Sequence, residues 1–164
     1  MELKRIIFLD IDGVLAGYKF LCAGRGFIDP EKVALINQLK GAEIVISSSW
    51  GYDNGRTEKT LRERGLELPI IGYTDHVHLG HDWICRGNEI EKWIIEHAHG
   101  MGTQYGDEYL HKDYQEFDYE YVIFDDNDDM LLGQKDHFIK TNEEYGVTQE
   151  DIDIASKILK LEED

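Results

Sequence analysis

Short apolar runs alternate along this chain with segments in which apolar residues recur at helical spacing. Four of these runs are nearly continuous, which is typical of strands that are buried on both faces of a sheet. A fifth run contains Pro69 and predicts an edge strand, because proline cannot donate a hydrogen bond to a neighbouring strand. The four buried strands are predicted at residues 4–9, 44–46, 121–124 and 137–139, and the edge strand at 68–71.

Four amphipathic segments predict helices, and residues at their ends have the properties of helix caps. Asp29 precedes a proline at the first helical position, and Gly41 follows the apolar stripe of this segment. Thr148 and Asp151 form a capping box at the start of a C-terminal helix. The helices are predicted between Asp29 and Gly41, over residues 57–64 and 88–98, and from Thr148 onward.

The order of these elements predicts the fold class. Strands that alternate with helices form a parallel sheet covered on both faces. We therefore expect an α/β protein, a Rossmann-like three-layer α/β/α sandwich with a mainly parallel central sheet. The length of 164 residues is typical of one domain, so residues 1–164 are predicted to form a single domain. Residues 100–120 are polar and lack periodicity, and they predict a loop, a small lid or an insertion.

Charge and hydropathy exclude two classes of protein. The formal net charge is −17, so the chain lacks the broad basic surface with which many proteins bind DNA or RNA. No apolar run approaches the roughly 18 residues that a membrane-spanning helix needs. The N-terminus has no apolar core or cleavage site of a secretion signal, and we expect a cytoplasmic protein. A local site could still bind a phosphate if a metal ion and a few cations neutralise it.

Polar side chains follow three of the predicted strands at their carboxyl ends. In parallel sheets these ends lie at one edge, and ligands of α/β proteins bind just outside that edge. The fold alone therefore predicts that the three pairs surround one cleft. The pairs are Asp10 and Asp12, Ser47 and Ser48, and Asp125 and Asp126.

The sequence Asp-Ile-Asp-Gly-Val-Leu that begins at Asp10 resembles the first motif of the haloacid dehalogenase-like (HAD) phosphatases. The resemblance continues to about Thr141, because the other motifs of that superfamily follow in order. It implies that Asp10 is the nucleophile that is transiently phosphorylated and that Asp12 is the general acid and base. Dehalogenating members lack the second aspartate, so the presence of Asp12 favours phosphoryl transfer.

The resemblance also implies a magnesium site. Mg²⁺ prefers hard oxygen ligands, and a phosphate dianion needs a cation before a carboxylate can attack it. Asp125 and Asp126 are the expected side-chain ligands, together with Asp10 and the backbone carbonyl of Asp12. Asp129 is a weaker candidate at the same turn.

Two further motifs supply phosphate contacts. The second motif is a serine that hydrogen-bonds a phosphate oxygen, and both Ser47 and Ser48 fit it. The third motif is a basic residue near the start of a later helix, and Arg86 occupies that place. A guanidinium can bind two phosphate oxygens at once and also position the nucleophile. Further substrate contacts are expected from Gly13, Ser49 and Trp50.

Within the superfamily, the compact size and the Ser-Ser-Ser-Trp sequence from Ser47 resemble the small phosphatase domains of polynucleotide kinases and RNA-repair proteins. The intervals between motifs leave no room for a large cap domain. The resemblance implies removal of phosphate from a nucleotide or a nucleic-acid 3′ end, and the negative charge favours short substrates. Two alternatives stay open: a phosphatase for sugar phosphates, and a non-catalytic binding or inhibitor protein whose acidic surface mimics nucleic acid. The sequence does not predict the oligomeric state.

Overall fold

A five-stranded sheet forms the centre of the protein. The computed structural model describes residues 3–52, 55–76, 78–79, 82–99 and 118–161. All neighbouring strands of this sheet are parallel, and their order is β3-β2-β1-β6-β7. The strands are β1 (Lys4–Leu9), β2 (Glu43–Ile46), β3 (Ile70–Tyr73), β6 (Tyr119–Asp125) and β7 (Phe138–Lys140).

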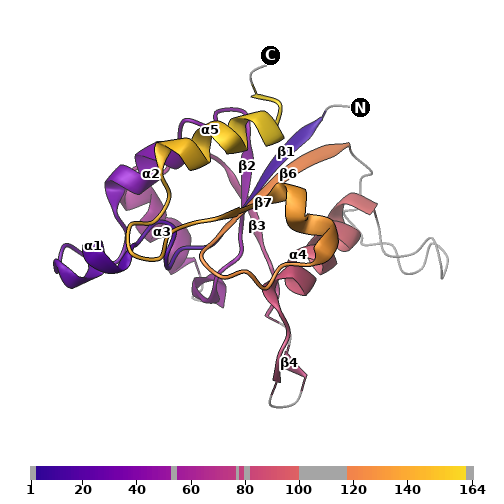
Figure 1. The fold of residues 1–164 in the computed structure, drawn as a ribbon, viewed down its shortest axis with the longest axis horizontal. Helices are drawn as coiled ribbons and strands as arrows, with labels where there is room; N and C mark the ends of the chain where they lie inside the picture. The colour runs from indigo at the N-terminus through magenta and orange to yellow at the C-terminus, as the bar shows by residue number, and fades with distance from the viewer. Residues whose placement is uncertain (1–2, 53–54, 77, 80–81, 100–117, 162–164) are drawn as a thin grey trace.

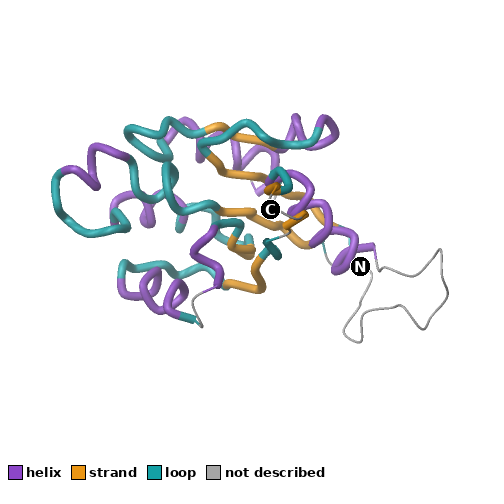
Figure 2. The backbone as a smooth tube through the Cα atoms, turned by 90° about the horizontal axis from the view of Figure 1, so that it is seen from below, coloured by secondary structure: helices purple, strands orange, loops and turns teal. Residues whose placement is uncertain are grey.

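Helices cover both faces of the sheet (Figure 1). One face packs against α2 (Pro30–Ile36), α3 (Arg56–Glu63) and α5 (Gln149–Ile158). The other face packs against α4 (Arg86–Ile94), which continues as a π-helical turn, η2 (Ile95–His99). Figure 2 shows from a second direction that the strands lie between the helices. The predicted three-layer α/β/α sandwich is thus confirmed.

The residues of β1 explain why a continuous apolar run was needed. Successive side chains of a strand point to opposite faces of the sheet. Ile7 and Leu9 are fully buried on the face of α2 and α5, whereas Ile6 and Phe8 are fully buried on the face of α4. The ring of Phe8 meets Trp93 of α4 edge to face, with centroids 5.5 Å apart. A polar residue at any of these positions would be buried without water.

The predicted elements are present, with shifted ends. β3 lies at the edge of the sheet as Pro69 indicated, but it begins at Ile70 and continues to Tyr73. The first amphipathic helix starts at Pro30 with Asp29 as its cap and ends at Ile36, before the predicted end at Gly41. β6 begins at Tyr119, so the predicted loop at 100–120 is wrong for its last two residues. Residues 100–117 of that loop lie outside the described part of the chain.

Several short elements were not predicted. A helix of five residues, α1 (Tyr18–Cys22), occupies part of the glycine-rich connection after β1. Its first amides donate to the carbonyls of Glu143 and Glu144, which no local pattern could indicate. Among the described helices, none is long and apolar enough to cross a bilayer. The short elements are α1 (Tyr18–Cys22), the antiparallel pair β4 (His78–Leu79) and β5 (Asp82–Trp83), and the 3₁₀ helices η1 (Ser49–Tyr52) and η4 (Leu132–His137).

Candidate active site

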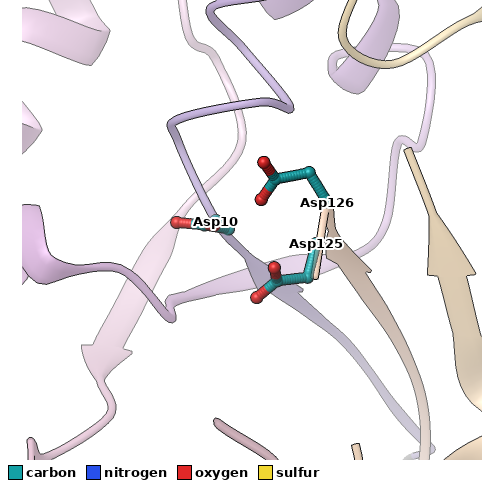
Figure 3. Close-up of side chains that lie close together, drawn as sticks. All are labelled: Asp10, Asp125 and Asp126. Atoms are coloured by element: carbon teal, nitrogen blue, oxygen red, sulfur yellow. The ribbon is translucent and has the colours of Figure 1, made fainter. Parts of the chain in front are cut away.

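Three aspartates meet at the carboxyl ends of β1 and β6. Asp10 follows β1 directly, and Asp125 is the last residue of β6. The amide of Asp10 donates to the carbonyl of Phe124 at 3.0 Å, which continues the pairing of the two strands. Oxygen atoms of Asp10, Asp125 and Asp126 lie within 4.8 Å of one another. Their side chains extend to the same side of the strand ends (Figure 3).

Burial makes this cluster electrostatically unusual. Asp10 is 6% exposed and Asp125 is 1% exposed. Burial raises the pKa of Asp10 to about 6, although the Arg86 guanidinium and a hydrogen bond from the Ile11 amide oppose the shift. Burial and the neighbouring charge of Asp10 raise the pKa of Asp125 to about 8. Clustered, buried carboxylates of this kind favour a divalent cation, so the donor set fits Mg²⁺.

Arg86 reaches the cluster from the face of the sheet that α4 covers. It is the first residue of α4, and its amide donates to the Asp129 carboxylate at 2.9 Å. Its Nε lies 3.7 Å from Asp125 Oδ2, and its Nη1 lies 3.6 Å from Glu89 Oε2. The side chain is 17% exposed, so a guanidinium is held beside the carboxylates in a largely desolvated place. Asp129 thus supports the start of α4 and is not part of the three-carboxylate cluster.

The two candidate serines lie in different environments. Ser47 continues β2, because its amide donates to the carbonyl of Leu9 at 2.9 Å. Its hydroxyl is buried and has no hydrogen-bond partner among the described residues. The hydroxyl of Ser48 accepts from the amide of Trp50 at 3.3 Å, and its position beside Asp10 lowers the pKa of that carboxyl. A bound oxyanion would therefore satisfy Ser47, while Ser48 already lies beside the side chain of Asp10.

Gly13 lets the loop after β1 pass close to Asp126. Its φ is +75°, and a Cβ atom at this position would lie 2.3 Å from Asp126 Cγ. The hydroxyl of Thr141 donates to the carbonyl of Gly13 at 2.8 Å and fixes the turn. A residue with a side chain would be strained there and would displace Asp126.

Asp12 and Trp50 are connected beside the cluster. Asp12 is exposed and accepts a hydrogen bond from the indole Nε1 of Trp50 at 3.1 Å. The side chain of Asp12 is not part of the three-carboxylate cluster. Ser49 is exposed at the start of η1, next to Trp50.

Sequence reasoning missed Glu89. It is 3% exposed, its Oε2 faces Arg86, and its Oε1 lies 3.2 Å from Nδ1 of His76. The spacing of three residues between Arg86 and Glu89 on a helix was the available signal, because such residues share one face. The acidic turn after Asp126 is otherwise solvated, since Asp128 is exposed and pairs with Lys140 at 3.6 Å.

Comparison with known proteins identifies the family of this chain. Searches of curated proteins and of solved structures gave no significant match. A family model described as the HAD domain in Swiss Army Knife RNA repair proteins matches residues 6–152. This range contains the strand ends, the serines, Arg86 and the aspartates after β6. The chain therefore belongs to the family of HAD domains found in Swiss Army Knife RNA repair proteins.

Proposed function

We propose that this protein is a Mg²⁺-dependent phosphomonoester hydrolase that acts through an aspartyl-phosphate on Asp10. Membership of the HAD family supports a phosphatase of this type in general. The observation that carries the proposal is the cluster of Asp10, Asp125 and Asp126 within 4.8 Å, with Arg86 beside it at the carboxyl ends of the strands. A structural role alone gives no reason to gather three carboxylates at one place, two of them buried.

Asp10, Asp125, Asp126 and the backbone carbonyl of Asp12 would hold the magnesium ion. The ion would supply positive charge that offsets the phosphate dianion. Arg86 adds a fixed cation on the side of α4, and Glu89 keeps its guanidinium oriented through the contact at 3.6 Å. The hydroxyl of Ser47 would donate to a phosphoryl oxygen, since it lacks a partner among the described residues. Ser48 would hold the carboxylate of Asp10 in the direction of attack.

The reaction would proceed in two displacements at phosphorus. An oxygen of Asp10 forms a bond to phosphorus while the bond from phosphorus to the leaving oxygen breaks, and Asp12 gives its proton to that oxygen. A water molecule then attacks the aspartyl-phosphate and gives a proton back to Asp12. This step frees Asp10 and releases inorganic phosphate. Asp12 is exposed, so it can exchange protons with both the leaving group and water.

The proposed substrate is a nucleotide or the 3′-phosphorylated end of a nucleic acid. The family description points to RNA repair. The net charge of −17 favours a short substrate, because each additional phosphate of a long strand would be repelled.

The test is phosphate release by the wild type and by Asp10→Asn, with Mg²⁺ and with EDTA. The substrates are mononucleotides, 3′- and 5′-phosphorylated oligonucleotides and sugar phosphates. We expect turnover to require Mg²⁺ and to fall about a thousandfold or more in Asp10→Asn. Asp128→Asn is the matched control, because Asp128 is an exposed aspartate of the same region that pairs only with a surface lysine in the described structure. Equal turnover by Asp10→Asn, or turnover in EDTA, would refute the mechanism.

The net charge favours one function of another class, a non-catalytic protein that mimics nucleic acid through its acidic surface. This alternative predicts a folded wild type that releases phosphate from no member of the panel.

A further inference from the structure

An exposed aromatic side chain lies at the rim of the candidate site. Phe27 is 70% exposed, although the two residues that follow it are buried. Its ring centroid lies 6.4 Å from that of Trp50, with the planes inclined by 62°. The amide of Asp29 donates to the carbonyl of Leu15 at 2.8 Å, which ties the segment of Phe27 to the loop after β1. The backbone two residues after Phe27 is thus anchored to that loop.

The contact of Trp50 with Asp12 relates these rings to the reaction. Trp50 donates to Asp12 Oδ2 at 3.1 Å. In the proposed mechanism Asp12 protonates the leaving oxygen, so the leaving group must lie within reach of Asp12. Trp50 borders this position through its bond to Asp12, and Phe27 lies next to Trp50. These two rings offer an apolar, π-rich surface at this position.

The opposite side of the same loop has a different chemistry. A cleft of about 460 Å³ lies there, lined in part by Gly13, Tyr18 and three carboxylates. The carboxylates belong to Asp126, Glu143 and Glu144. Glu143 and Glu144 lie outside the proposed cation site, so they disfavour further phosphates of a substrate in this cleft. It also contains an exposed aromatic residue, since Tyr18 is 66% exposed. Phe27 and Tyr18 are thus two aromatic residues of similar exposure on the two sides of the loop, and Tyr18 can serve as a control for Phe27.

We infer that Phe27 and Trp50 form a stacking surface for the base of the nucleoside that leaves during hydrolysis. The inference rests on the proposed function and specifies its substrate as a nucleoside phosphate. Bases stack on aromatic side chains with little dependence on sequence, and loss of one such contact lowers affinity by about 10- to 100-fold. A sugar phosphate has no base and therefore lacks this stacking contact.

The test compares two substrates that differ only in the base. One is adenosine 3′-monophosphate, and the other is the corresponding abasic tetrahydrofuran 3′-phosphate. We expect Phe27→Ala to lower kcat/KM for the nucleotide about 10- to 100-fold, mainly through KM, and to leave the abasic substrate unchanged. Phe27→Tyr should retain the wild-type values because it keeps the ring. Tyr18→Ala should leave both substrates unchanged.

The possible outcomes separate this inference from the proposed function. Equal hydrolysis of both substrates by the wild type, or an equal loss on both in Phe27→Ala, would overturn the stacking surface and leave the phosphatase intact. A loss of nucleotide preference in Tyr18→Ala alone would also overturn it, because the base would then lie in the acidic cleft. No phosphate release from any substrate would overturn the proposed function itself. A 3′-phosphorylated trinucleotide, run beside the mononucleotide, distinguishes a strand end from a free nucleotide as the source of the stacked nucleoside.

Discussion

At the scale of single residues, Gly13 shows how a backbone position controls the cluster of aspartates. It has a φ of +75° and leaves no room for a Cβ atom beside Asp126. We expect Gly13→Ala to reduce the free energy of unfolding by about 1 to 3 kcal/mol, through strain in the left-handed region. The displaced Asp126 should also weaken the binding of Mg²⁺, so that phosphate release needs a higher concentration of Mg²⁺.

Chemical denaturation and a Mg²⁺ titration of activity measure these two effects. Gly133→Ala is the control, since no atom beyond its own chain neighbours lies within 4 Å of the position of an added Cβ at Gly133. If Gly13→Ala matched this control in both measurements, the close approach to Asp126 would have no functional importance.

The residue types of the site could be predicted from sequence, whereas their partners could not. Asp10, Asp125 and Asp126 lie at the carboxyl ends of two strands, so the fold class alone brings them to one edge. The choice between Ser47 and Ser48 stayed open because both follow the same strand, and only packing leaves the hydroxyl of Ser47 without a partner among the described residues. Glu89 was missed because its importance depends on the direction in which α4 crosses the sheet.

At the scale of elements, α5 depends on the cap at its start. The Thr148 hydroxyl accepts from the amide of Asp151, and the Asp151 carboxylate accepts from the amide of Thr148. We expect Thr148→Ala to reduce the free energy of unfolding by about 1 kcal/mol, because the amide of Asp151 loses its acceptor and the Asp151 carboxylate loses the hydrogen bond from the hydroxyl. Urea denaturation measures this change. Ser156→Ala lies inside the same helix and should be close to neutral, so equal effects of the two substitutions would argue against the cap.

The strands and long helices were predictable for a physical reason. A parallel strand that is covered on both faces must be apolar throughout, and an amphipathic helix must repeat its apolar side chains every turn. The residues at which the helices end were less predictable. The helix that begins at Pro30 ends at Ile36, yet Leu39 beyond it is still buried, so the apolar stripe continued past the helix itself. α1 depends on backbone bonds to Glu143 and Glu144, which are far away in the sequence.

At the scale of the whole molecule, the net charge of −17 affects the rate at which a negatively charged substrate associates with the protein. Like charges repel over roughly 30 Å at 0.01 M salt but only about 8 Å at 0.15 M. We therefore expect kcat/KM for a 3′-phosphorylated oligonucleotide to increase between these salt concentrations at constant free Mg²⁺. The increase should be smaller for a mononucleotide. A decrease with salt, as basic nucleic-acid-binding proteins show, would mean that a local cationic surface dominates.

The central position of β1 also has a consequence for the order of folding. β1 pairs with β2, its neighbour along the chain, and with β6, which follows more than a hundred residues later. Pairings between such distant segments close slowly, because a long loop must lose its entropy first. A chain that has emerged from the ribosome only as far as β3 carries Asp10 but neither Asp125 nor Asp126. The proposed cation site therefore cannot form in a chain that ends before β6, and metal binding would report that β1 and β6 have paired.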